Sequence, residues 1–129
     1  MEQINKLPMF VRQEARDAYA VIRGFVYQVE RTILAWLDLD EETVLFCECG
    51  EDIDFVRQIV EQGSEGPVEE RLLEQIKYHQ GKALSLRSKE ILEAIANFVL
   101  HKKSNPHHRL KMRFFTNANP AKEKGAPFP

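Results

Sequence analysis

The sequence predicts an α/β domain in which helices cover a mixed sheet of about four strands. Three observations lead to this class: a long helical pattern of apolar residues near the N-terminus, three consecutive strand-like segments, and a second helical segment that precedes a last strand. Because the last strand follows a helix, we expect it to join the sheet through a right-handed crossover. With 129 residues, 43% of them hydrophobic and 29% charged, the chain has the size and composition of one globular domain.

The first helix is expected from about residue 8 to residue 39. Its apolar residues recur at intervals of three and four, as one buried stripe requires: Ala18, Val21, Ile22, Phe25, Val29, Ile33, Trp36 and Leu37. Gly24 costs the helix roughly 1 kcal/mol relative to Ala, so we expect close packing there or a break between two helices. We interpret Phe25, Tyr27 and Trp36 as core residues rather than as residues that stack on nucleic-acid bases.

Three strands are expected to follow, over residues 43–49, 51–62 and 68–79. The second of these segments is ambiguous, because Ile53 and Phe55 alternate as in a strand, whereas Ile53, Val56 and Val60 would suit a helix. We favour the strand, since the third segment resembles its hairpin partner across the turn-rich QGSEGP. A small helical adaptor without this hairpin is the alternative.

A second helix is expected from the N-cap Ser88, with Ile91, Leu92, Ile95, Phe98 and Val99 on one side, until KSNPHH ends it. The alternating segment 109–117 then forms the fourth strand. Beyond it the chain contains Pro, Gly and Lys without periodicity. We therefore expect a domain over residues 1–118 and, over residues 119–129, a linker or the start of an absent segment.

The net charge of −2 is distributed unevenly along the chain. Residues 1–76 contain 7 Lys or Arg and 17 Asp or Glu, whereas residues 77–129 contain 11 and 3. This asymmetry indicates either an anionic partner for the second half or attraction between the two halves in the fold.

Two further features bear on the compartment. No apolar run of about 18 residues and no charged leader before an apolar stretch are visible, so we expect a cytoplasmic protein without a membrane span or signal peptide. Cys47 and Cys49 are too close for an unstrained bridge, so we expect reduced, buried thiols.

Polar residues on the second and third strands point to one patch of chemistry. If these strands pair, an acid from residues 52–54 lies beside Gln75 and Lys77. A carboxylate and a side-chain or backbone carbonyl are oxygen ligands of the kind that Mg²⁺ prefers, and an adjacent ammonium can orient a water and offset phosphate charge. The plainer alternatives are turn residues at Asp52 and Asp54 and a solvated edge strand at Lys77.

These residues resemble a known arrangement. The stretches that carry the likeness are RGFVYQ (23–28), ED (51–52), QIKYH (75–79), SKEILEAIANF (88–98) and FFTNA (114–118). An acid at a strand start, followed by a hairpin and a strand with (E/Q)-x-K, resembles the PD-(D/E)xK nuclease superfamily with its restriction-endonuclease-like core. The chain is most similar to the double-stranded-DNA endonuclease domains of CBASS (CD-NTase-associated) and STAND-type antiphage effectors.

The resemblance implies hydrolysis of phosphodiester bonds in double-stranded DNA with Mg²⁺ or Mn²⁺. It makes Asp52 the metal-binding acid, Gln75 and the backbone carbonyl of Ile76 further metal ligands, and Lys77 the catalytic lysine. In this family the first helix often carries a Glu where this chain has Gln28, so Gln28 would bind a coordinated water rather than the metal itself. Three additional candidates follow from their positions near the patch: Glu48, Asp54 and Gln28.

The resemblance also implies partners. We expect fusion to, or assembly with, a sensor or oligomerisation domain, and a homo-oligomer when the protein is active, without membrane contact. Residues expected to contact DNA phosphates, or else to form only a solvated face, are Lys82, Lys102, Lys103, Arg109 and Lys111. His101, His107 and His108 are expected in a solvated loop, with a zinc site as the weaker alternative. A catalytically inactive module of the same fold, which binds DNA or a protein, is the alternative function.

Overall fold

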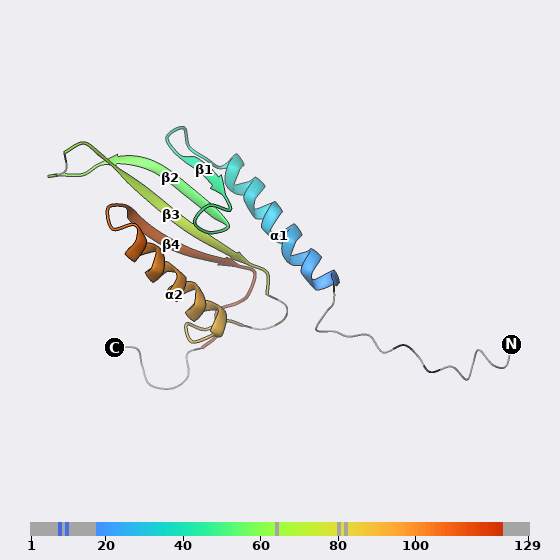
Figure 1. Cartoon of the computed structure of the whole chain (residues 1–129). Helices are drawn as coiled ribbons and strands as arrows, with labels where there is room; N and C mark the ends of the chain where they lie inside the picture. The colour runs from blue at the N-terminus through green and yellow to red at the C-terminus, as the bar shows by residue number, and fades with distance from the viewer. Residues whose placement is uncertain are drawn as a thin grey trace.

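The computed structural model describes Pro8, Phe10 and residues 18–63, 65–79, 81 and 83–122. In this part of the chain the elements are α1 (Ala18–Leu37), β1 (Val44–Cys47), β2 (Ile53–Val60), β3 (Pro67–Lys77), α2 (Lys89–Ser104) and β4 (Arg109–Thr116). The predicted order of helix, three strands, helix and strand is confirmed (Figure 1). Because residues 53–60 form a strand, the helical-adaptor alternative is wrong.

The four strands form one mixed sheet in the order β1-β2-β3-β4. β1 pairs with β2 and β2 with β3 in antiparallel fashion, whereas β3 and β4 run parallel and are joined through α2. The β2–β3 ladder begins where Ile53 faces Glu74, and β3 continues to Lys77, which faces Thr116 of β4. The last three residues of β3 therefore extend past the start of β2.

The two helices cover opposite faces of the sheet, as Figure 1 shows. Ala35 of α1 packs on Ile53 and Ile76, which form the buried core of that face. Phe98 of α2 lines a small cavity with Leu73 on the other face. Leu73 and Ile76 lie an odd number of positions apart on β3, so their side chains point to opposite sides.

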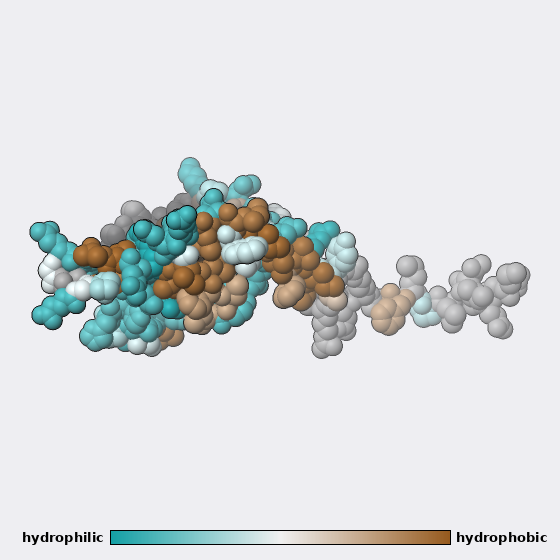
Figure 2. Space-filling model, turned by 90° about the horizontal axis from the view of Figure 1, so that it is seen from above, coloured by the Kyte–Doolittle hydropathy of each residue, from teal (hydrophilic) through white to brown (hydrophobic). Residues whose placement is uncertain are grey.

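The apolar stripe of α1 is not where the sequence predicts it. Most of its side chains lie on the solvent side of the helix, and Figure 2 shows hydrophobic residues gathered along α1. The residues of α1 that are buried or half-buried are Gly24, Tyr27, Gln28, Arg31, Thr32 and Ala35. The helix therefore turns a largely polar stripe inward, because charged and amide groups of the sheet end lie beneath it. Neither described helix is both long and apolar enough to cross a membrane.

Several individual predictions about packing are corrected in the same way. Phe25 and Trp36 are 67% and 65% exposed rather than core residues, whereas Tyr27 is half-buried between Tyr78 and Phe115. Gly24 has no neighbour within 4 Å of an added Cβ, and α1 is continuous through it, so neither explanation proposed for it holds.

Cys47 and Cys49 are free, as predicted, but exposed rather than buried. Cys47 ends β1, and Cys49 follows in the turn to β2. β1 is an edge strand of four residues with neighbours on one side alone, so it shields its side chains less than an inner strand does.

Hydrogen bonds continue past Lys77 and Thr116, the last residue pair of the parallel strands β3 and β4. The Asn117 side chain accepts a hydrogen bond from the His79 N–H (2.7 Å) and donates one to the His79 carbonyl (2.9 Å). Leu84 forms a parallel bridge with Pro120, supported by hydrogen bonds to Asn119 and Ala121. Residues 119–121 thus pack back on the segment before α2.

Candidate active site

The candidate site lies at the end of the sheet where β2 begins and β3 ends. Asp52 immediately precedes β2, and its Oδ2 accepts a hydrogen bond from the backbone N–H of Ile76 at 2.7 Å. The Asp52 carboxylate therefore binds the strand segment that continues past the last β2 partner, between positions 75 and 77. This places Asp52 beside the backbone of the Gln75-Ile76-Lys77 segment.

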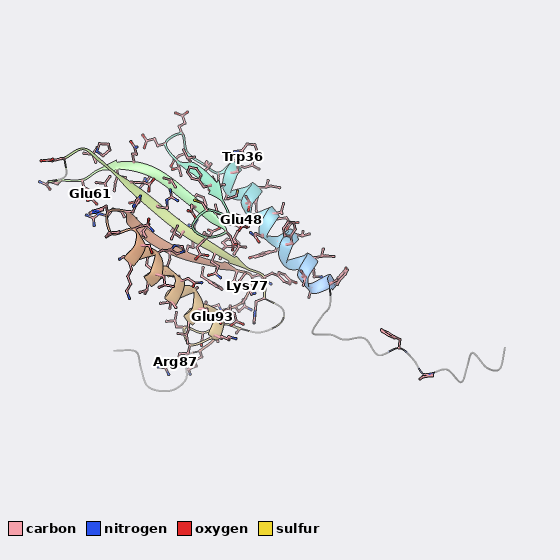
Figure 3. All side chains as sticks on the ribbon, viewed as in Figure 1. Trp36, Glu48, Glu61, Lys77, Arg87 and Glu93 are labelled. Atoms are coloured by element: carbon pink, nitrogen blue, oxygen red, sulfur yellow. The ribbon has the colours of Figure 1, made fainter. Side chains whose placement is uncertain are left out.

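Gln28 links two carboxylates at this end. Its side-chain nitrogen donates to Glu48 Oε1 at 2.8 Å and lies 3.3 Å from Asp52 Oδ1. Glu48 lies in the β1–β2 turn with a φ of 54°, the left-handed region that a non-glycine residue adopts only at a cost of order 1 kcal/mol. Its N–H donates to the Asp52 carbonyl (3.1 Å), so the turn brings the two acids together. Figure 3 shows Glu48 near α1 and Lys77 at the end of β3.

The Asp52 carboxyl is in an environment that disfavours its charge. Burial raises the pKa of Asp52, and the negative charges of Glu48, Glu51 and Glu74 raise it further, against the opposing effect of the Ile76 N–H. Among the residues that the structure describes, no arginine or lysine forms an ion pair with Asp52. The site therefore holds a carboxylate that a cation would stabilise.

Gln75 and Lys77 lie on the opposite face of β3 from Ile76, because side chains alternate along a strand. The structure therefore does not bring the Gln75 side chain to the Asp52 carboxylate, which lies with Gln28 on the α1 side. Gln75 lines a small cavity with Glu51 and His101, whose side chains are 3.1 Å apart. Lys77 is exposed, and in the described part of the chain its ammonium has no hydrogen-bond or ion-pair partner. The lysine is thus available to a ligand that approaches the end of the sheet.

Asp54, the second acid proposed for the patch, has a different environment. It is fully buried, and its carboxylate accepts hydrogen bonds from the N–H groups of Gly50 (2.9 Å) and Glu51 (3.0 Å). Arg71 completes the arrangement with an ion pair at 2.8 Å. Asp54 holds the β1–β2 turn on the sheet, and its charge is already balanced.

A charged cluster that the sequence analysis did not identify lies next to the site. Glu74 is fully buried and accepts two hydrogen bonds from Arg31 (both 2.8 Å) and one from Arg113 (2.6 Å). The signal was present in the sequence: Glu74 alternates with Leu72 and Ile76 on the inward face of β3, where an acid needs a cationic partner. Arg31, which follows Gln28 by three residues on α1, joins the helix to the sheet through Glu74.

The proposed DNA-contacting residues are not gathered at the site. Arg109 is ion-paired with Glu61 at 2.6 Å, and Lys111 with Glu70 at 3.5 Å. Figure 3 shows Glu61 and Lys77 at opposite ends of the sheet. Arg109 lies opposite Glu70 of β3, which is seven positions, about 23 Å, from Lys77. Lys102 and Lys103 lie exposed in the last turn of α2, whereas Lys82 is outside the described residues.

Two of the histidines pair with acids, and His101 lies half-buried in the last turn of α2 rather than in the predicted solvated loop. His101 lies 3.1 Å from Glu51, and His108 lies 2.8 Å from Glu69. The described residues contain no group of three or more His, Cys, Asp or Glu side chains positioned to hold a metal ion. A cation at the site would accordingly take at most two carboxylates from these residues and complete its shell with amide or backbone oxygens and water.

Comparison of the chain with protein-family models, with curated proteins and with solved structures finds no match.

Proposed function

We propose that the protein is a metal-dependent endonuclease domain for double-stranded DNA, with a restriction-endonuclease-like core of the PD-(D/E)xK type. The observation that carries the proposal is the 2.7 Å hydrogen bond between Asp52 and the Ile76 N–H. It joins the acid before β2 to the centre of the Gln75-Ile76-Lys77 segment on β3. The element order and the mixed four-stranded sheet form an α/β fold, the broad class to which such a core belongs.

Mg²⁺, or Mn²⁺ in its place, fits the chemistry of these residues. Asp52 would hold it together with the Ile76 carbonyl, and Glu48, which shares the Gln28 amide with Asp52, would add negative charge. The Gln75 amide, which the sequence suggests as a further ligand, lines the opposite face of the sheet. A carboxylate has about four lone-pair sites, and the observed hydrogen bonds to Asp52 use two of them. When bound, the ion would activate a water and neutralise charge at the scissile phosphate.

The chain's own side chains would divide the remaining work. Gln28 keeps Glu48 and Asp52 side by side despite their like charges. Lys77, exposed and without a described partner, would orient the attacking water and balance the negative charge that develops on the phosphate. The protein would act as the effector of a larger cytoplasmic antiphage assembly, with a sensor or oligomerisation domain that activates it.

A second candidate is a catalytically inactive module of the same fold. Glutamine rather than glutamate occupies positions 28 and 75, and the described residues provide no cluster of three acidic, histidine or cysteine ligands. Such a module would bind DNA or a protein without cleaving it.

Plasmid cleavage in Mg²⁺ or Mn²⁺ distinguishes the two candidates. We expect the wild-type protein to nick and linearise plasmid, and Lys77→Ala to lower the rate at least about 100-fold, the usual contribution of a positioned proton-transfer or charge-stabilising group. Lys89→Ala is the matched control, because Lys89 is exposed and pairs with Glu93 alone at 3.7 Å. Unchanged cleavage by Lys77→Ala would remove Lys77 from the mechanism, and DNA binding without cleavage by the wild type would favour the inactive module.

A further inference from the structure

The outer surface of α1 carries a regular row of exposed apolar side chains. We call this row the α1 seam; it consists of Tyr19, Ile22, Val26, Val29, Ile33 and Trp36. These side chains are between 42% and 65% exposed. Apolar residues exposed in one continuous row indicate a contact surface more often than apolar residues scattered singly.

The spacing of the α1 seam is that of a coiled-coil helix. Its members follow one another at intervals of three, four, three, four and three residues, so two sets of three recur every seven residues. This is the a/d repeat by which one helix inserts side chains into the spaces of another helix. The seam contains no charged residue, and the stripe of α1 that packs on the sheet, with Arg31 at its centre, lies on the opposite side.

We infer that the α1 seam binds the α1 seam of a second copy of this chain. The a/d repeat is self-complementary, since each helix offers both the side chains and the spaces that its partner needs. Phe25 and Leu37 lie next to the α1 seam with exposures of 67% and 70%, so they widen its apolar surface.

Charge complementarity supports an antiparallel pairing of the two helices. Arg23 and Glu30 are exposed and lie seven residues apart along the same edge of the α1 seam. When Val26 of one copy packs on Val29 of the other, the antiparallel arrangement brings Arg23 of each copy to Glu30 of its partner. A two-fold axis repeats this ion pair on both sides, so one contact pattern serves both copies.

The inference does not rest on the proposed nuclease activity, because self-association is measured without DNA or metal. It adds a consequence for the candidate site, since the helix that would pair through its outer face presents Gln28 on its inner face to Glu48 and Asp52. Pairing would hold two such sites in a fixed two-fold relation.

Sedimentation equilibrium of the full chain tests the inference. We expect the wild type to sediment at twice 15.0 kDa, and Ile22→Lys/Ile33→Lys to raise the dimer dissociation constant by on the order of 100-fold, because two pairs of like charges would meet in the seam. The matched control is Leu92→Lys/Leu100→Lys on α2, where exposures of 50% and 61% are close to the 57% and 49% of the seam pair. This control should remain dimeric. A monomeric wild type, or a dimer that only the α2 variant disrupts, would overturn the inference.

An exchange of the charges at Arg23 and Glu30 tests whether the two helices are antiparallel, and it leaves the apolar residues of the α1 seam unchanged. Arg23→Glu and Glu30→Arg should each weaken the dimer, and the double exchange Arg23→Glu/Glu30→Arg should restore it. Circular dichroism of each variant establishes that the fold is retained. Failure of the double exchange to restore the dimer, when both single variants weaken it, would overturn the antiparallel arrangement.

Discussion

Two pairs of acids in this sheet differ in how their charge is balanced. Glu74 and Asp54 are fully buried, and arginines contact both of them. Asp52 and Glu48, only a few residues away, share a neutral amide from Gln28. The first pair joins the helix and the turn to the sheet. The second pair retains negative charge that the described residues leave unbalanced.

The difference separates residues that maintain the fold from residues available for chemistry. A buried acid with an arginine partner has little to offer a ligand, because binding a second cation would require breaking an existing ion pair. An acid whose pKa is raised by burial and by its acidic neighbours gains stabilisation from any cation that enters. Balance of charge, rather than residue type, therefore distinguishes the two pairs.

The largest expected effect tests the buried side of the comparison. Glu74→Gln removes the charge that Arg31 and Arg113 share, and we expect the free energy of unfolding to fall by about 3 kcal/mol. Urea denaturation measures it. Glu61→Gln, which removes the half-buried partner of the exposed Arg109, should cost less than about 1 kcal/mol. Equal costs would show that burial does not set the two kinds of ion pair apart.

A second change tests how tightly the β1–β2 turn packs around the Asp54 carboxylate. A Cβ at Gly50 would lie 2.8 Å from both Asp54 Oδ2 and Leu73 Cδ2, so Gly50→Ala should lower the free energy of unfolding by about 2 kcal/mol. Gly24→Ala is the opposite case: with open space around the new methyl group, it should stabilise α1 by about 0.5–1 kcal/mol. Thermal unfolding of both variants gives the two signs. An unchanged free energy of unfolding for Gly50→Ala would mean that Asp54 and Leu73 move aside to accept the new methyl group.

The smallest expected effect concerns Asp52 and depends on pH. Because its pKa is raised above the ordinary value near 3.8, the folded protein binds this proton more tightly than the unfolded chain. The associated stability is complete below that ordinary value and is lost as pH rises through the folded-state pKa. Asp52→Asn should therefore be slightly more stable than the wild type at pH 7, and the difference should shrink as pH falls.

Unfolding in chelator across this pH range measures the effect of Asp52→Asn. Glu48→Gln is the informative companion, since it removes one of the charges that raise the Asp52 pKa and should flatten the same pH dependence in part. A variant Asp52→Asn that is less stable than the wild type at pH 7 would contradict the comparison, because it would place Asp52 with the acids that maintain the fold.

The sequence was informative wherever local pattern decides structure. Alternation and turn residues predicted the hairpin of β2 and β3, and Ser88 marked the start of α2. Pairing of the two strands then placed the Asp52 carboxylate at the Ile76 backbone, but alternation along β3 turned the Gln75 side chain to the opposite face. These relations depend on neighbours along the chain or across one turn, which a single sequence contains.

Contacts between distant elements could not be predicted in this way. Helical period identified the apolar stripe of α1 but not which side of the helix meets the sheet, because that depends on Arg31 reaching Glu74, 43 residues later. In the same way, only the fold shows that Asp54 meets Arg71 while Asp52 meets Gln28. Hydrophobic periodicity alone therefore gave the wrong face for Phe25 and Trp36.

The Asn117 side chain limits which insertions and deletions this region can accept during evolution. Its amide contacts both backbone groups of His79 and so acts as one more rung beyond the last strand pair, two residues after Lys77. A rung of this kind depends on the spacing of the chain rather than on neighbouring side chains. An insertion between Lys77 and His79, or between Thr116 and Asn117, would move the Asn117 amide away from the His79 backbone. The lengths of these two segments should therefore be kept in related sequences even where the residue types vary.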